Sequence, residues 1–533
     1  MNIPILNREF GPTARQSYIL LLACSLLFTA HWLWCQQGPL LNDDVRYAGY
    51  AKQVLNGNFV ITEDPLSSRW APILVGAAFM GVFGVSYWAL SLPMLLAGLA
   101  LLLVLFLHLR RYGTGIALLS ILLVGLQLSV LRFSTLFLPD LLMALFLTLA
   151  LIALYEGRNN PGTAIRQALL FCAFFLPGFP VQRNLPHGLA GTGFSYHYDF
   201  VVRRAEQFWF VVFAVAFGVL MLYLCGYYWA TGSVFFRLTS LMESTLVKSS
   251  LSFFDKPFWP SPFVASVMSS PFLARAGLAI PLVFGLPSLA AFELRRLHSA
   301  RSYWTLLAFS YLAVFWFGSA SLPYYNPLHL AEEHLITWVP LMAIAGAISL
   351  VRVLKDRRNA LTFALGFAIC VALTWHQQTY LMMTVYSGLV LIFSGVYFFP
   401  SLASLGIYAS MIALSLPVLA QMAIPKDQGL AELESCYVSG IKAYPNRIIT
   451  DSRIKENHPW FERFEPVKGQ YLSFKDFVLQ EEVLQAGDLV LYYAPHLYGY
   501  EAESRADFDR LLEDHVYDIL CSSPQVTLLF LSK

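Results

Sequence analysis

The sequence predicts a polytopic α-helical membrane protein that carries a small C-terminal α/β domain. Of its 533 residues, 57% are hydrophobic and 13% are charged, whereas about 25% of residues are charged in an ordinary soluble protein. The mean hydropathy is +0.59. This composition excludes a water-soluble globular protein and a disordered chain.

Charge is divided unevenly along the chain. From Lys426 to Lys533 there are 18 acidic and 11 basic residues, a net charge of −7, and the preceding residues carry a net charge of +9. We therefore expect a basic, apolar membrane domain over 1–424 and a separate soluble domain over 425–533. The second part is long enough to fold around a core of its own.

Eleven apolar runs predict transmembrane helices, because crossing a hydrocarbon core takes about 20 residues and flanking residues extend the shortest runs. The stretch 157–207 contributes either no crossing or two, so we expect 11 to 13 spans. The runs are 17–35, 88–108, 114–137, 140–156, 208–229, 272–293, 303–320, 335–351, 360–375, 379–398 and 402–424.

Clusters of basic residues between these runs predict the orientation of the chain. Placing all of them in the cytoplasm satisfies the positive-inside rule, with the N-terminus in the cytoplasm and the C-terminal domain outside. No small-residue cleavage site follows the first run, which we therefore expect to remain as a span. The clusters lie at 8–15, 110–111, 158–166, 203–204, 295–301 and 352–358.

The region 36–87 is expected outside the membrane and contains two predicted helices. Apolar side chains at 47, 48, 51, 54 and 55 recur at helical spacing, so they predict an amphipathic helix. Asn42 or Asp43 would cap it. The run Trp70 to Gly84 is too short to span, and a crossing there would turn Arg110 and Arg111 outward. We expect it to lie in the outer leaflet.

Two acidic residues stand at predicted outer membrane boundaries. Asp43 begins the amphipathic helix, and Asp140 follows Pro139 where the third run leaves the membrane. An N-cap role alone would account for either residue. Alternatively, two carboxylates at one cavity would supply a general base and either a metal ligand or an orienting acid. The residues alone leave both interpretations open.

Four short stretches occur in a recognisable order. They are Asp43-Asp44-Val45-Arg46-Tyr47-Ala48, then Phe83 to Pro93 with its Trp-Ala-Leu-Ser-Leu-Pro ending, then Arg110-Arg111-Tyr112-Gly113, and Leu138-Pro139-Asp140-Leu141-Leu142. Over about 38–156 the chain thus resembles the GT-C-fold glycosyltransferases that use polyprenyl-phosphate sugars. That superfamily includes the protein O-mannosyltransferases and the bacterial lipid A aminoarabinose transferases.

The resemblance implies a GT-C fold and an inverting glycosyltransferase on the outer face of the bacterial inner membrane. Its donor would be a polyprenyl-phosphate sugar, and its acceptor a hydroxyl of a lipid, glycan or protein. Asp43 stands at the family's catalytic-acid position and would take the proton from the acceptor hydroxyl. Asp140 stands at the position of the family's second acidic residue. A divalent metal ion held by Asp43 and Asp140 is the one cofactor we consider, and nothing indicates a nucleic-acid partner.

Five further residues are candidates for substrate binding. Arg69 stands where the family has a lysine before a Pro-Pro pair, and would pair with the donor phosphate. Arg132 lies inside the third run, where a charge is expected to have a function or a partner. The remaining candidates are Asp44 and Tyr47, beside Asp43, and His334, near a family segment that ends in proline.

Other membrane functions remain as alternatives. A transporter or flippase for polyprenyl-linked glycans would commonly show internal repeats and charges at mid-span, and the sequence shows neither. An O-antigen polymerase or ligase also uses polyprenyl-linked sugars, but that class relies more on external arginine and histidine than on a first-loop acid pair. If Asp43 and Asp140 are only caps, a non-catalytic assembly protein also remains.

The C-terminal residues predict a small α/β domain. Apolar segments at 447–451, 488–494 and 526–531 predict buried strands, while 474–484 and 504–515 predict amphipathic helices. No P-loop or Gly-x-Gly-x-x-Gly motif supports a nucleotide function. The domain would either bind the acceptor or form a purely structural cover over the cavity, and both interpretations remain open. Cys436 and Cys521 form either a disulfide or two buried thiols, and the sequence does not decide between them.

Overall fold

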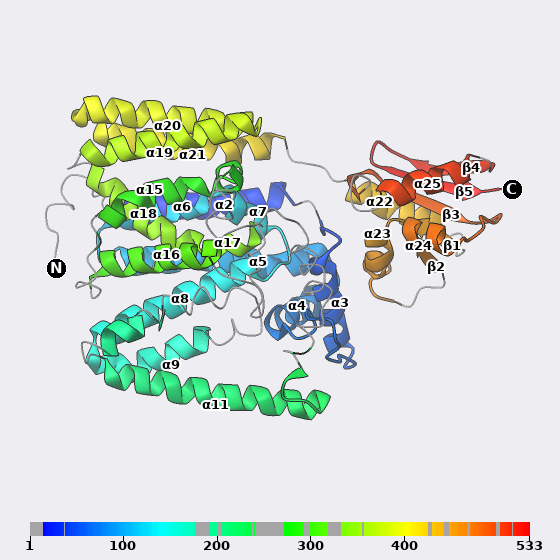
Figure 1. The fold of residues 1–533 in the computed structure, drawn as a ribbon, viewed down its shortest axis with the longest axis horizontal. Coiled ribbons are helices and arrows are strands. Elements are labelled where there is room, and N and C mark those ends of the chain that lie inside the picture. The colour runs from blue at the N-terminus through cyan, green and yellow to red at the C-terminus, as the bar shows by residue number, and fades with distance from the viewer. Residues whose placement is uncertain are drawn as a thin grey trace. The chain divides into compact units, whose positions relative to one another are not determined.

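The computed structural model resolves the chain into two compact units (Figure 1). One comprises Met1–Cys35, Ile61–Pro72 and Leu92–Ile424; the other comprises Gln36–Val60, Ile73–Ser91 and Pro425–Lys533. The residues described are 14–36, 38–175, 192–193, 195–200, 205–236, 239, 271–290, 292, 299–317, 332–353, 357–424, 429–441, 447–465, 469–496, 502–513 and 515–532.

Long apolar helices make up the first unit. Within the described residues, helices lie in each of the eleven predicted runs, and turns interrupt three of these runs, 114–137, 272–293 and 335–351. The helices are α2 (Ala14–Trp34), α5 (Tyr87–Leu109, with its first turn in the other unit), α6 (Thr114–Gly125), α7 (Leu128–Ser134), α8 (Asp140–Asn159), α9 (Ala164–Phe175), α11 (Glu206–Thr231), α15 (Ala279–Ala290), α16 (Ala300–Phe317), α17 (Glu333–Ile336), α18 (Val339–Val353), α19 (Arg357–His376), α20 (Tyr380–Phe398) and α21 (Ala403–Ala423). Short 3-10 turns precede α9 (η1, Pro161–Thr163) and α21 (η4, Pro400–Leu402).

The described helices confirm a multi-pass membrane protein. Within the described ranges, seven helices are long and apolar enough to cross a bilayer, and a bent pair adds an eighth if it counts as one span. Shorter apolar helices are α15, α18 and α4 (Trp70–Phe83). The structure therefore contains the helix predicted for the run at 70–84, while its depth in the membrane stays a prediction.

The predicted span at 114–137 is sharply bent. A continuous helix is expected there, but α6 and α7 meet at an angle of 64°. The break follows Gly125, a weak helix former. The buried Gln127 then donates from Nε2 to the carbonyl oxygen of Ala276 at 3.4 Å, and Ser129 donates from Oγ to the same oxygen at 3.4 Å. Hydrogen bonds from these polar side chains to another backbone segment thus accompany the interruption of the helix.

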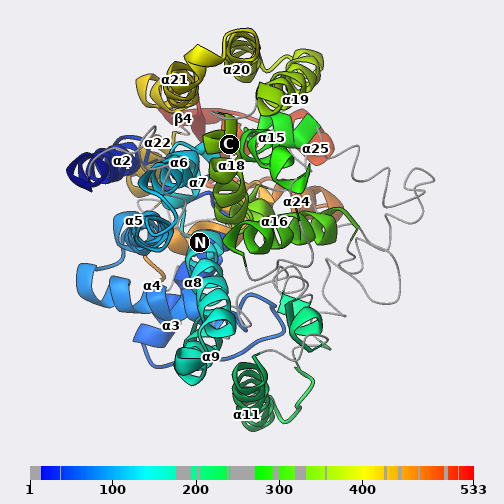
Figure 2. The ribbon, with the colours of Figure 1, turned by 90° about the vertical axis from the view of Figure 1, so that its left-hand side faces the viewer.

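The short helix α18 forms the centre of the first unit. It packs against α6, α15 and α16, which surround it in Figure 2. Gly285 of α15 allows the two helices to approach closely, because a Cβ atom at this position would lie only 2.3 Å from Sδ of Met342 on α18. Without water to drive apolar association, helices in membranes pack through such small residues.

A buried ion pair links α8 to α11 through the carboxylate of Asp199. Arg158, at the end of α8, donates from Nε and Nη2 to the carboxylate of Asp199 at 2.5 and 2.7 Å. Trp209 of α11 donates from Nε1 to the same carboxylate at 2.9 Å. By contrast, α11 exposes most of its length, including Phe210 and Trp229, as a lipid-facing helix would.

The C-terminal residues form a five-stranded sheet in the order β2-β1-β3-β5-β4. β1 (Arg447–Thr450) is parallel to β2 (Gln470–Ser473) and β3 (Leu489–Tyr493), whereas β5 (Val526–Leu531) is antiparallel to β3 and to β4 (Tyr517–Ser522). The helices are α22 (Leu430–Cys436), α23 (Ser452–Asn457), α24 (Phe474–Leu479) and α25 (Ala502–Leu512). Single turns lie at η5 (Tyr437–Ile441), η6 (His458–Trp460) and η7 (Ala494–His496).

This sheet confirms the predicted small α/β domain and differs from it in detail. The three predicted strands are β1, β3 and β5. β2 and β4 were missed, because β2 has four residues and β4 is an exposed edge strand without a clear apolar alternation. The helix predicted over 474–484 ends at Leu479, shortly before Glu481 takes a left-handed conformation with φ 51°. Phe474, Phe477 and Phe508 form the core between sheet and helices.

The two cysteines of the C-terminal domain are joined in a disulfide. Cys436 at the end of α22 and Cys521 on β4 have Cα atoms 5.8 Å apart and are separated by 85 residues in sequence. The other described cysteines are free thiols. Of the two alternatives that the sequence left open, the structure has the disulfide, which ties the first helix of the domain to its edge strand.

Removing this disulfide should destabilise the C-terminal domain. A cross-link that closes a loop of this length restricts the unfolded chain, and losing it typically costs about 2–5 kcal/mol. We expect the Cys436→Ser/Cys521→Ser variant to show a lower apparent melting temperature and faster trypsin cleavage after residue 430. Cys225→Ser, which removes an exposed free thiol, serves as the control. Equal trypsin resistance of all three proteins would contradict a stabilising role.

Candidate functional site

The loop before α3 (Asp43–Leu55) is held by Asp44. Its carboxylate accepts the backbone N–H of Leu40 at 2.6 Å and that of Asn42 at 3.0 Å, one on each oxygen. The hydroxyl of Tyr87 donates to the same carboxylate at 3.3 Å. Asp44 is buried. Burial raises the pKa of this carboxyl group, and the backbone and Tyr87 hydrogen bonds oppose that rise.

Residues from the C-terminal part of the chain brace the same loop. Asn457 donates from Nδ2 to the carbonyl oxygen of Leu41, at 2.9 Å. Leu41 has φ 53°, so its left-handed backbone depends on such support. The ring of Trp460 contacts Tyr87 edge to face at 6.0 Å between centroids. Tyr47 is fully buried in this assembly.

Asp43 differs sharply from its neighbour. Its side chain is 42% exposed and forms a long ion pair, 4.0 Å, with Nη1 of Arg46. The expected amphipathic helix is confirmed, with Val45, Ala48 and Ala51 on its buried face. Asn42 occupies the N-cap position, but its side chain makes no capping hydrogen bond, and Asp43 is the first helical residue. Capping therefore does not account for Asp43.

Asp140 is the centre of a polar cluster in the first unit. It is buried at the first residue of α8, where Pro139 occupies the N-cap position, so of the two interpretations left open, capping does not account for Asp140. α7 and α17 both pack near this end of α8. Tyr311 of α16 lies within electrostatic range of Asp140. Its hydroxyl donates to the carbonyl oxygen of His334 at 3.1 Å and also hydrogen-bonds to Thr337.

Two predicted cations lie on the elements of this cluster. Arg132, on α7, has a half-exposed side chain with Nη1 3.8 Å from Oε2 of Glu332. His334, on α17, is buried with Nε2 3.7 Å from Oε1 of Glu333. The structure thus places Arg132, Asp140 and His334 on α7, α8 and α17, three helices that contact one another. Tyr311, near Asp140, and Glu332, the partner of Arg132, were missed, because each interaction joins residues far apart in the sequence.

Arg69 ends a compact loop just before α4. Its backbone N–H donates to the carbonyl oxygen of Leu66 at 3.0 Å. The adjacent ring of Trp70 stacks on Tyr227 of α11 at 6.0 Å between centroids. Within the loop, the buried Ser67 donates from Oγ to the carbonyl oxygen of Asp64 at 2.8 Å. These contacts fix the backbone that carries Arg69.

The described residues offer no ready-made metal site, since no three His, Cys, Asp or Glu side chains among them cluster closely enough to hold an ion. Asp43 and Asp140 belong to different units. A metal ion shared by these two carboxylates therefore stays a prediction.

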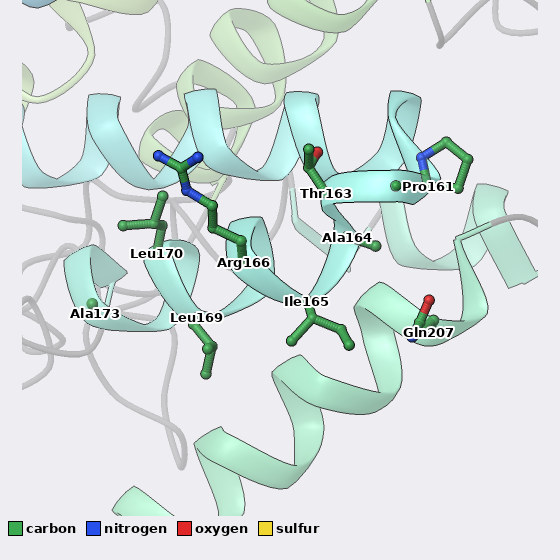
Figure 3. A pocket seen from close by; sticks show the side chains of 10 residues that line it. Pro161, Thr163, Ala164, Ile165, Arg166, Leu169, Leu170, Ala173 and Gln207 are labelled. Carbon is green, nitrogen blue, oxygen red and sulfur yellow. The ribbon is translucent and has the colours of Figure 1, made fainter.

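A pocket of about 790 Å³ lies at the opposite end of α8 from Asp140 and contains no predicted site residue. With 20 residues, α8 separates its two ends by about 30 Å. Figure 3 shows side chains of α9, among them Arg166 and Leu169, and Gln207 of α11 around this pocket. The pocket is therefore separate from the polar cluster around Asp140.

Comparison with known proteins identifies the architecture. Residues 71–179 match the family model for dolichyl-phosphate-mannose-protein mannosyltransferase. Crystal structures of ArnT from Cupriavidus metallidurans, bound to undecaprenyl phosphate and in the apo state, each match with a TM-score of 0.55 and 13% identity, over 97% of this chain and 98% of that chain. The chain has the GT-C fold. No curated protein sequence matches it.

The family match begins within α4 and runs through α5 to α9. It includes Tyr87, the hydroxyl donor to Asp44, as well as Arg132 and Asp140. Asp43 and Asp44 precede the matched region. The similarity to ArnT covers 97% of this chain, so it extends beyond the membrane helices into the C-terminal domain.

Asp44→Asn should destabilise the loop before α3. Both carboxylate oxygens accept backbone N–H groups, whereas asparagine has one acceptor and would turn its NH₂ group toward a second donor. A buried donor left unsatisfied costs about 1–3 kcal/mol. We expect a lower apparent melting temperature and increased proteolysis within 36–60.

Asp43→Asn is the matched control for that experiment. It changes the adjacent carboxylate, whose long, half-exposed ion pair contributes about 0–1 kcal/mol at most. Equal melting temperatures for the two variants would contradict the assignment of Asp44 as the residue that holds the loop.

Proposed function

We propose that the chain is an inverting glycosyltransferase that moves a sugar from a polyprenyl phosphate to a hydroxyl acceptor. The reaction takes place on the outer face of the bacterial inner membrane, and the acceptor is a lipid, a glycan or a protein. The observation that carries this proposal is the similarity of nearly the whole chain to ArnT bound to undecaprenyl phosphate.

The donor class follows from two independent likenesses. The matched family is named for dolichyl-phosphate-mannose, and the matched crystal structure binds undecaprenyl phosphate. Both molecules combine a long isoprenoid with a phosphate. A multi-pass membrane protein suits such a donor, because the isoprenoid remains in the bilayer while the phosphate and sugar lie at its surface.

Asp43 is the proposed general base. A hydroxyl is a weak nucleophile at neutral pH, so a carboxylate that accepts its proton speeds the attack on the anomeric carbon. The new bond forms between the acceptor oxygen and that carbon as the bond to the phosphate oxygen breaks, and the lipid phosphate leaves. Asp43 suits this role because it is half exposed, and the neighbouring Asp44 fixes its backbone.

The other candidates divide into three groups. Arg69 and Arg132 would neutralise the donor phosphate, and Arg132 is half exposed as such a role requires. Asp140 would orient a substrate hydroxyl together with Tyr311 and His334. Both carboxylate oxygens of Asp44 already accept backbone N–H groups, so we assign Asp44, and with it Tyr47 on the same helix, to positioning Asp43 rather than to substrate contact.

The proposed sidedness rests on charge. The basic clusters at 110–111, 158–166 and 352–358 fall between predicted spans, and the positive-inside rule puts them in the cytoplasm. Asp140 begins α8, whose other end carries Arg158, so Asp140 then faces outward. This orientation puts the N-terminus inside and the C-terminal domain outside.

Asp43→Asn should abolish transfer without preventing folding. Loss of a general base typically lowers the rate about 10²–10⁴-fold. We expect that loss in turnover of a polyprenyl-phosphate sugar by protein in lipid nanodiscs, with the dissociation constant of the donor unchanged. Glu63→Gln, which changes an exposed acid in the connection between α3 and α4, is the control. Turnover that survives Asp43→Asn would exclude Asp43 as the base.

Asp140→Asn should lower turnover with little effect on donor binding. A misoriented substrate hydroxyl reacts more slowly, and small displacements cost about 10²-fold. The measurement is kcat and KM for the donor and acceptor separately. A higher donor KM with unchanged kcat would instead assign Asp140 to donor binding.

A further inference from the structure

The C-terminal domain contains a groove that the glycosyl transfer proposed above does not use. Its volume is about 360 Å³, at the lower end of the range for small-ligand sites. The groove runs over one face of the sheet, between α25 and the edge strand β4. Its described lining includes Tyr492, Arg505, Tyr517, Ile519, Thr527 and Leu529.

The sheet register explains the apolar floor of the groove. Tyr492 on β3 pairs with Thr527 on β5, and Leu529 on β5 pairs with Ile519 on β4. Alternate residues of a strand share one face, so these side chains line the same side of the sheet. Tyr517 and Ile519, on the edge strand, are 43% and 62% exposed.

The helix α25 provides the polar wall. Arg505 lies over the ring of Tyr492, with its guanidinium carbon 5.2 Å from the ring centroid. The hydroxyl of Tyr492 donates to Oδ1 of Asp509 at 2.6 Å, and Nε of Arg505 is 3.5 Å from Oδ2 of the same carboxylate. Arg505 is therefore a preoriented planar donor whose charge is largely balanced by Asp509.

We infer that this groove binds a saccharide, with a sugar ring stacked on Tyr517 and its hydroxyls bonded to Arg505 and Thr527. A sugar ring has an apolar C–H face and hydroxyl groups around its rim. The exposed ring of Tyr517 suits the apolar face of the sugar. The planar guanidinium of Arg505, with the hydroxyl of Thr527, suits the hydroxyl groups of the sugar. The Arg505–Asp509 pairing favours a neutral saccharide over a phosphate, which would need an unbalanced cation.

The edge of the sheet argues against an extended peptide as the occupant. Strand addition needs a regular row of free backbone groups on β4. The ladder between β4 and β5 is irregular between Ile519 and Cys521, and Asp518 adds a charge to the edge strand. Bulges and edge charges are features that block strand addition.

This inference deepens the proposed function, and the identity of the saccharide as part of the acceptor rests on that function. The acceptor would then be a glycan, one sugar of which is held by the C-terminal domain. Saccharide binding by the groove itself can be measured without any transfer reaction.

The test uses the full chain in lipid nanodiscs and biotinylated neutral tetrasaccharides of glucose, mannose and N-acetylglucosamine, with a tetragalacturonate as the acidic counterpart. We expect at least one neutral probe to bind. Tyr517→Ala and Arg505→Ala should each weaken it about tenfold. Tyr517→Phe, which keeps the ring, should bind like the wild type.

Arg510→Ala is the matched control for Arg505. It lies on the same helix, but its side chain is 73% exposed and paired with Asp507 at 2.9 Å. Retention of the Cys436–Cys521 disulfide in each variant checks that the domain has folded.

The inference is overturned if no neutral saccharide binds, or if binding is insensitive to both Tyr517→Ala and Arg505→Ala. Donor turnover is measured separately on the wild type. Saccharide binding without donor turnover would defeat the proposed transferase and leave the groove assignment intact, whereas turnover without saccharide binding would defeat the groove alone.

Discussion

The lack of water in the hydrocarbon core of a bilayer governs this chain, because every backbone N–H and C=O there must find a partner within the protein. Helices meet that demand by themselves, and helices lie in each of the eleven apolar runs over the residues that the structure describes. The sharp bend between α6 and α7 is accompanied by hydrogen bonds from Gln127 and Ser129 to Ala276. Charged groups capable of chemistry are consequently confined to helix ends and to the connections between them.

At one such connection, two adjacent carboxylates have separate tasks. Asp44 is buried and bonded through both oxygens to the loop that precedes α3, and Tyr87 and Asn457 bring distant parts of the chain to the same loop. Asp43, one residue earlier, keeps an exposed carboxylate on a backbone that cannot move freely. A positioned base of this kind is what a hydroxyl nucleophile requires.

The sequence predicts what local periodicity encodes. The lengths of the apolar runs predict the membrane helices, and the spacing of residues 47, 48 and 51 predicts α3. Short apolar segments predict β1, β3 and β5. Features that depend on distant partners were missed: the break after Gly125, the edge strand β4, and the contacts of Tyr311 with His334 beside Asp140. Of the two interpretations of Asp140, capping fails because Pro139 takes the cap position. Which acid is buried, Asp43 or Asp44, is likewise decided by tertiary packing.

The central claim is that the chain breaks the bond between a sugar and a polyprenyl phosphate. It is tested most directly with purified protein in liposomes that contain an undecaprenyl-phosphate sugar and a hydroxyl acceptor, by measuring free undecaprenyl phosphate and glycosylated acceptor together. The account predicts one lipid phosphate released for each sugar transferred. Movement of the intact donor across the bilayer, with no release of lipid phosphate, would contradict it and identify a transporter.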